Sequence, residues 1–195
     1  MRRFLLPFSL LAAGFGLIAP AGAGLATGNY HAISQYISEL GAMGMTSANL
    51  VNLGIFLPTA ILNLVAVVWL SSQLPRPYKA RALLLLGLAI GNFGAVIFPC
   101  DTGCPAEGSG QQAIHNLLGL IQYGSGGMAL VLMSRFVAPP AGWCLGAIVF
   151  GCLIQMGGPG NEMRGLWQRV AEVCLYGWLP LCAWKLLSRP ASGRP

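Results

Sequence analysis

Long apolar runs alternate along this chain with short polar connections. Six runs approach the roughly 20 residues that a helix needs to cross the hydrocarbon core of a membrane. They cover approximately residues 4–26, 48–70, 82–99, 113–133, 142–156 and 167–187. None alternates strictly between apolar and polar positions, as the strand of a membrane β-barrel does. The pattern therefore predicts an all-α fold, an integral membrane bundle of six transmembrane helices that forms a single domain over residues 1–195.

The first run has two interpretations. A basic start at Arg2 and Arg3, an apolar stretch and a small-residue segment at residues 21–23 are typical of a secretory signal peptide. The apolar stretch is longer than most signal cores, which favours a retained helix. Both interpretations place Thr27 on the outer side of the membrane.

The connection after the first run, residues 29–41, has an amphipathic pattern. Its apolar residues recur at helical spacing: Ile33, Ile37 and Leu40. Its polar residues lie on another face: His31, Gln35, Ser38 and Glu39. We predict a short outer amphipathic helix between spans one and two, ending near Gly41. Its polar face either is solvated or turns inward over the mouth of the bundle, toward Asp101.

Composition agrees with a membrane protein, since 55% of the residues are hydrophobic and only 8% are charged, against about 25% charged in soluble domains. The formal net charge is +6, but proteins that bind nucleic acid gather basic residues on one polar face. Here the basic residues flank apolar runs, so no nucleic-acid partner is expected.

The positions of the basic residues predict the orientation of the chain. With the N-terminus in the cytoplasm, nine of the eleven Lys and Arg residues face inward: Arg2, Arg3, Arg76, Lys79, Arg81, Arg135, Lys185, Arg189 and Arg194. Cytoplasmic connections carry such an excess of basic residues. We therefore predict a multi-pass protein of the bacterial inner (plasma) membrane with both termini in the cytoplasm.

Acids and histidines gather on the opposite, outer side or just inside it. The acids are Glu39, Asp101, Glu107, Glu162 and Glu172, and the histidines are His31 and His115. Cys100 and Cys104 flank Asp101 in the second outer loop, where an oxidising compartment favours a disulfide between them. Two thiols are too few for a closed zinc site, which takes four ligands.

Polar residues within the spans predict one outer site. His115 and Gln122 are seven residues apart on one helical face, and Arg169 precedes Glu172 by three. A carboxylate in a span needs a partner. Arg169 and Glu172 therefore form either an ion pair that locks the helix end or the floor of an outward-open cavity.

Spans three and four are joined by a short loop, so their joined ends lie close together. Asp101 and His115 fall at these ends, and we predict that Asp101 accepts a hydrogen bond from His115. His31 and Glu39 would form the opposite wall of the same site.

Three short motifs resemble one known family. They are Ile37–Gly41 (ISELG), Pro99 to Asp101 at the end of the third span, and His115 at the start of the fourth. The chain resembles, over about residues 5–187, the multi-spanning prokaryotic membrane proteins of the domain of unknown function 998 family. The resemblance implies six spans and a retained first helix. It singles out Ser38, Glu39, Asp101 and His115 as matching the family pattern, and it supplies no activity.

Three functions remain open, in this order of preference. The first is binding, without a cofactor, of a membrane lipid headgroup or a small amphiphilic ligand by His31, Ser38, Glu39, Asp101, His115, Arg169 and Glu172. The second is a metal-dependent hydrolase in which His31, Asp101 and His115 hold zinc. Its catalytic candidates are Asp101, His115 and Glu39, with Glu172 as an alternative proton carrier. The third is a small transporter, for which the chain shows no internal repeat. The sequence predicts no oligomeric state.

Overall fold

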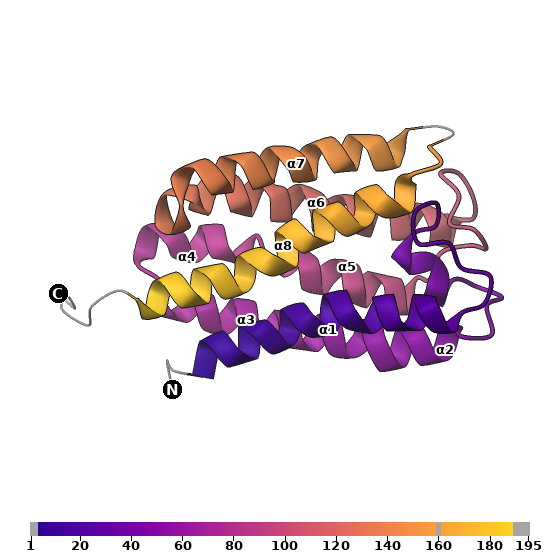
Figure 1. Ribbon diagram of the computed structural model, residues 1–195, viewed down its shortest axis with the longest axis horizontal. Helices are drawn as coiled ribbons and strands as arrows, with labels where there is room; N and C mark the ends of the chain where they lie inside the picture. The colour runs from indigo at the N-terminus through magenta and orange to yellow at the C-terminus, as the bar shows by residue number, and fades with distance from the viewer. Residues whose placement is uncertain (1–3, 159–160, 189–195) are drawn as a thin grey trace.

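The computed structural model, which describes residues 4–158 and 161–188, is one elongated bundle of helices (Figure 1). All regular structure in these residues is helical, which confirms the predicted fold class. Six helical segments are long and apolar enough to cross a membrane: Leu5–Ala26, Ala48–Gln73, Arg76–Ile97, Gly110–Val137, Pro139–Gly157 and Arg164–Leu187. They correspond one to one with the six predicted spans.

Two of the spans are built from more than one element. The second joins α2 (Ala48–Val51), the π-helical segment η3 (Asn52–Phe56) and α3 (Leu57–Gln73), and the third joins α4 (Arg76–Leu83) and α5 (Leu86–Ile97). The other spans are single helices: α1 (Leu5–Ala26), α6 (Gly110–Val137), α7 (Pro139–Gly157) and α8 (Arg164–Leu187). Pro139 begins α7, because proline suits the first turn of a helix.

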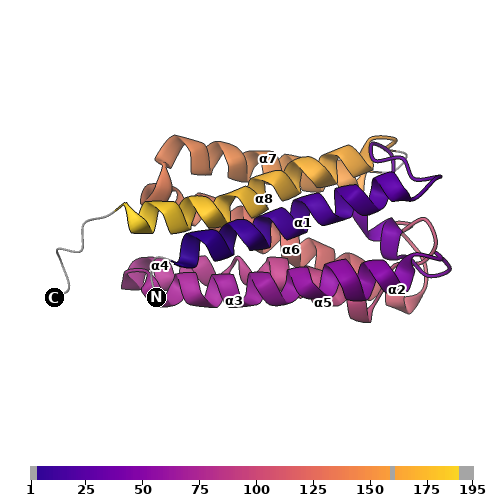
Figure 2. The ribbon, with the colours of Figure 1, turned by 60° about the horizontal axis from the view of Figure 1, so that its bottom comes forward.

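The helices close into a ring in which the first and last spans are neighbours. Helix α6 packs between α5 and α7, α8 packs on α7, and α1 packs on both α8 and α3. Figures 1 and 2 both show α1 beside α8. Helix α1 is thus an integral part of the bundle.

Glycines let these helices approach closely. A Cβ atom at Gly16 of α1 would lie 2.6 Å from the Tyr176 ring, and one at Gly126 of α6 would lie 2.6 Å from Leu175. Small residues at such crossings are the usual means of packing helices in lipid, where hydrophobicity does not drive helices together. Gly16 and Gly126 therefore let α1 and α6 pack closely against α8.

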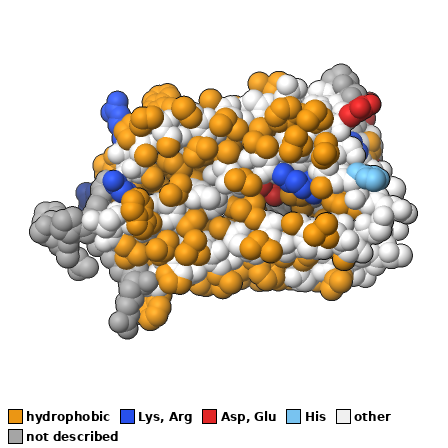
Figure 3. Space-filling view, viewed as in Figure 1, with side chains coloured by type: hydrophobic (Ala, Val, Ile, Leu, Met, Phe, Trp, Pro, Cys, Tyr) orange, Lys and Arg blue, Asp and Glu red, His pale blue; other side chains and the backbone are white. Residues whose placement is uncertain are grey.

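The charged residues separate along the bundle axis. Five described basic residues lie at the end where the described chain begins and finishes: Arg76, Lys79, Arg81, Arg135 and Lys185. Four others assigned to this side, Arg2, Arg3, Arg189 and Arg194, lie outside the described residues. Figure 3 shows Lys and Arg near this end and hydrophobic side chains along the length of one face.

The first outer loop differs in form from its prediction. Instead of an amphipathic helix on the membrane surface, it contains a single short 3-10 helix, η2 (Ile37–Gly41), which turns inward. Ile37, Glu39 and Leu40 are buried. Glu39 starts this helix by accepting a hydrogen bond from the backbone N–H of Tyr36 at 2.8 Å. The outcome resembles the inward-turned alternative, and the helix ends at Gly41 as predicted.

Candidate functional site

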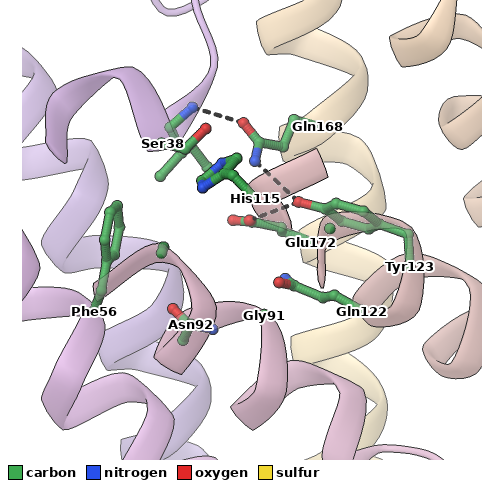
Figure 4. Close-up of a pocket in the computed structure, with 12 residues that line it drawn as sticks. Ser38, Phe56, Gly91, Asn92, His115, Gln122, Tyr123, Gln168 and Glu172 are labelled. Atoms are coloured by element: carbon green, nitrogen blue, oxygen red, sulfur yellow. Dashed lines mark hydrogen bonds between the residues drawn. The ribbon is translucent and has the colours of Figure 1, made fainter. Parts of the chain in front are cut away.

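A small polar cavity lies beneath η2, between α5, α6 and α8. Its volume is about 50 Å³. Its polar lining consists of Ser38, Asn92, His115, Gln122, Tyr123, Gln168 and Glu172. In Figure 4 the Glu172 carboxylate and the Gln122 amide point into this space. Three of the predicted ligand-binding residues, Ser38, His115 and Glu172, are therefore brought together.

A directed chain of hydrogen bonds positions Glu172. The backbone N–H of Ile37 donates to Gln168 Oε1 at 2.6 Å, and Gln168 Nε2 donates to the Tyr123 hydroxyl at 3.0 Å. Tyr123 in turn donates to Glu172 Oε1 at 3.1 Å, as Figure 4 shows. Because a backbone N–H can only donate, it fixes the orientation of the Gln168 amide and the direction of every later bond. Glu172 thus receives a proton donor at Oε1.

His115 is oriented by a backbone carbonyl. Its Nδ1 lies 2.8 Å from the carbonyl oxygen of Phe98. A carbonyl oxygen only accepts, so Nδ1 carries a proton and Nε2 of the neutral ring is an acceptor. Gln122, two helical turns further along α6, lines the same cavity, as their spacing predicted.

A larger groove adjoins the cavity between α6 and α7, at the end of the bundle that carries η2. Its volume is about 400 Å³, and its apolar lining includes Leu120 and Met156. The cavity and the groove share five lining residues: Ser38, His115, Gly119, Tyr123 and Gln168. A Cβ atom at Gly119 would meet no other atom within 4 Å. The junction of the two spaces is therefore open at Gly119.

Asp101 has a different partner from the one predicted. Its carboxylate accepts hydrogen bonds from the backbone N–H and the hydroxyl of Ser109, both at 2.8 Å. Ser109 caps α6 by accepting a hydrogen bond from the backbone N–H of Gln112. The predicted hydrogen bond from His115 is wrong, because α6 begins five residues before His115 and Asp101 supports that start. Asp101 lines neither the cavity nor the groove.

Glu39 is held by a residue that the sequence analysis did not assign to the site. Arg164 Nη2 lies 2.9 Å from Glu39 Oε1, forming the ion pair present among the described residues. Arg164 also donates to the carbonyl oxygens of Ser34 and Gly103, each at 3.0 Å. Its guanidinium lies 4.8 Å from the centroid of the Tyr36 ring. Glu39 therefore ties the outer loops to α8 and does not line the cavity.

Two further expectations about the site are wrong: the placement of His31 in its wall and the pairing of Arg169 with Glu172. His31 is exposed and lines neither space. Arg169 does not pair with Glu172. It donates to the carbonyl oxygens of Ala32 at 2.6 Å and Gln35 at 3.2 Å. The first outer loop lies against the start of α8, and its carbonyl groups bind the guanidinium there.

Two tyrosines contact these arginines: Tyr30 contacts Arg169 and Tyr36 contacts Arg164. Arg169 donates to the Tyr30 hydroxyl, and the Tyr36 hydroxyl donates to the carbonyl oxygen of Met156 at 2.6 Å. Burial raises the pKa of both hydroxyls above the usual value for tyrosine. Both tyrosines therefore keep their protons at neutral pH and act as hydrogen-bond donors. Both residues lie in the loop between α1 and η2. The sequence pattern of this loop did not indicate that they bind the arginines or the backbone.

The cysteine pair in the second outer loop forms the predicted disulfide. Cys100 and Cys104 are bonded, with their Cα atoms 5.1 Å apart. The turn between them includes Gly103 at φ 78°, a conformation that glycine adopts readily. The Ser38 hydroxyl lies 3.5 Å from Cys104 Sγ. The disulfide thus packs beside the shared wall of the cavity and the groove.

The residues present do not fit the zinc alternative. Among the described residues, the group of three side chains that approach within 4.8 Å of one another is Cys100, Cys104 and His115. The alternative set of His31, Asp101 and His115 is not gathered in this way. Disulfide-bonded cysteines offer no thiolate to a metal ion.

Comparison with protein families places the chain beside its relatives. The family described as "Protein of unknown function (DUF998)" matches residues 10–185, which is most of the chain and agrees with the resemblance carried by the three motifs. No curated protein and no solved structure matches.

Proposed function

The chain belongs to the DUF998 family, and we propose that this multi-pass protein binds a membrane amphiphile at its outer end. The polar head of the ligand would occupy the cavity, and its apolar chain would occupy the groove between α6 and α7. One observation carries this proposal. The polar cavity and the larger, more apolar groove share five lining residues and meet at Gly119, where no side chain fills the space.

A path from the membrane supports this function. The side chains of Leu117 and Leu120 on α6 and of Ile154 on α7 are more than half exposed, and in a membrane they face lipid. Ligand sites usually combine apolar walls with a few convergent polar groups, which is the arrangement here. An amphiphile in the outer leaflet can therefore enter sideways between α6 and α7.

The polar head of the ligand, rather than its acyl chain, should determine which ligand this site selects. An acyl chain that leaves the lipid for an apolar groove exchanges one hydrocarbon environment for another, so its transfer contributes little. A polar head placed against oriented hydrogen-bond partners contributes about 0.5–1.5 kcal/mol for each bond, and more for charged groups. The cavity, rather than the groove, thus decides which amphiphile binds.

The orientation that we propose places the cavity on the outer side of a bacterial inner membrane, with both termini in the cytoplasm. Its support is the concentration of basic residues at the opposite end and the disulfide beside the cavity, which an oxidising compartment maintains. We expect reporter domains fused at Gln111 to be active outside the cell and those at Pro77 and Ser188 to be active inside. An outside signal at Ser188 would overturn the orientation.

Filling the junction of cavity and groove tests the binding function. We expect Gly119→Leu to weaken binding of monododecanoylglycerol at least tenfold, because the new side chain enters the opening at Gly119. The measurement is native mass spectrometry of the purified protein with increasing amounts of this probe.

The matched control is Gly124→Leu in the same helix. A Cβ atom at Gly124 also meets no atom within 4 Å, and Gly124 lines neither space. Leucine raises helix propensity by a similar amount, roughly 0.8 kcal/mol, at both positions. Equal probe binding by the two variants and the unaltered protein would refute binding at this site.

A further inference from the structure

The proposed function leaves the kind of head group open, and the hydrogen-bonding pattern of the cavity narrows it. We infer that the cavity selects a primary ammonium head, so that the ligand is a long-chain primary amine. This inference rests on the proposed function, because it concerns the chemistry of the same site.

The first support is the state of Glu172. Its side chain is only 6% exposed, and its described hydrogen bond is the one from Tyr123 to Oε1. Oε2 receives no hydrogen bond from the described residues, and the side chain lines the cavity. A carboxylate within a membrane span is costly unless it is paired. A cation in the cavity would supply the missing partner.

The second support is that the nearby protein cations are committed elsewhere. Arg169 donates to loop carbonyls and to Tyr30, and Arg164 pairs with Glu39. Neither arginine lines the cavity. An anionic head group would therefore meet the Glu172 carboxylate there without direct contact with either arginine.

The third support is the balance of donors and acceptors. Donor groups on four lining residues already have protein partners. Gln168 donates to Tyr123, Tyr123 donates to Glu172, and His115 donates from Nδ1 to Phe98. The Asn92 amide donates to the carbonyl oxygen of Leu88 and to the Tyr176 hydroxyl.

Three acceptor atoms of the cavity lining receive no hydrogen bond from the described residues and remain available to a ligand. They are Glu172 Oε2, His115 Nε2 in the neutral ring, and Asn92 Oδ1. Ser38 and Gln122 can each donate or accept. An ammonium group carries three donors and no acceptor, as a lysine side chain does, and so it matches this set. A phosphate or carboxylate carries only acceptors and does not.

The size of the cavity restricts the head further. A first water molecule requires roughly 10–15 Å³ by this measure of volume, so about 50 Å³ holds only a few waters. A primary ammonium group is about the size of one water molecule. A trimethylammonium group is larger, and its methyl groups would shield the charge from hydrogen-bond acceptors. The cavity therefore favours the primary over the quaternary amine.

Competition among matched 12-carbon amphiphiles tests this inference. Protein in lipid nanodiscs is loaded with radiolabelled dodecylamine, which is then displaced by unlabelled dodecylamine, dodecyltrimethylammonium, 1-dodecanol or dodecanoate. We expect dodecylamine to displace the label at concentrations at least tenfold lower than the other three. Glu172→Gln keeps an acceptor for Tyr123 but removes the charge, and we expect it to abolish this preference.

Two controls separate the site from general effects. Glu162→Gln removes an exposed acid at the same end of the bundle and should leave the preference intact. An equal loss in this variant would assign the preference to surface charge and overturn the inference. The comparison of dodecylamine with dodecyltrimethylammonium needs no variant, so it tests the inference even if Glu172→Gln fails to fold.

The remaining outcomes distinguish the two proposals. If all four amphiphiles bind with equal affinity in the unaltered protein, selection of the ammonium head is refuted while amphiphile binding stands. If neither these probes nor monododecanoylglycerol binds, the proposed function itself falls. Tighter binding of dodecanoate than of dodecylamine would reverse the assigned charge of the head.

Discussion

Replacing Arg164 with alanine is expected to lower the free energy of unfolding by about 2–4 kcal/mol. Removing one partner of a buried ion pair costs roughly 3–5 kcal/mol, because the remaining charge is left unpaired. Glu39 is buried, with 4% of its surface exposed, whereas the side chain of Arg164 is 29% exposed, so we expect a value toward the lower end. The measurement is unfolding by sodium dodecyl sulfate in mixed micelles.

The effect should be specific to the contacts of Arg164. This side chain joins both outer loops to α8 through Glu39 and two backbone carbonyl groups. Glu162→Gln, which changes an exposed charge nearby, should alter stability by less than about 0.5 kcal/mol. A double-mutant cycle with Glu39→Gln should show a coupling energy of about 1–3 kcal/mol. Additive effects would show that the ion pair does not hold the outer end together.

Gly165→Val is expected to destabilise the protein by about 1–3 kcal/mol, the usual cost of forcing extra atoms into a packed site. A Cβ atom at Gly165 would lie 2.6 Å from the carbonyl oxygen of Ala32 and would also overlap that of Gln35. These are backbone atoms, so they cannot move aside as the tip of a flexible side chain could. Unfolding in mixed micelles again provides the measurement.

Gly165→Val should also change the structure of the cavity lining. The loop at residues 32–35 is held to α8 by the hydrogen bond from the backbone N–H of Leu166 to the carbonyl oxygen of Ile33, at 2.9 Å. Displacing this loop shifts η2 and weakens the bond from Ile37 to Gln168. Gly177→Val, at a site in α8 where a Cβ atom meets nothing within 4 Å, is the control. Similar stability of the two variants would contradict close packing at Gly165.

The spans were predictable because crossing a membrane imposes length and apolarity on each segment separately. Local rules also put His115 and Gln122 on one face. These features depend on residues that are near one another in the sequence. The disulfide belongs with them, since only three residues separate Cys100 from Cys104.

The partners of the charged groups were not predictable in this way. Spacing along one helix favoured Arg169 as the partner of Glu172, and loop length favoured His115 as the partner of Asp101. In the folded chain Glu39 pairs with Arg164, 125 residues away, and Glu172 binds Tyr123 on another helix. Tyr123 and Gln168 carry the chain of hydrogen bonds, but a sequence shows only one more aromatic and one more polar residue in an apolar span.

The closure of the ring by α1 and α8 sets the order in which this protein can mature during its synthesis. Of the six spans described, α8 leaves the ribosome after the other five, and it brings Arg164, Gln168 and Glu172 with it. Until it is inserted, the two loops that Arg164 joins to α8, those between α1 and α2 and between α5 and α6, lack this arginine. Glu172 enters a bundle in which Tyr123 is already present to receive it. The cavity is therefore completed only when α8 is inserted, and a nascent chain stalled before α8 lacks the Gln168 and Glu172 that line it.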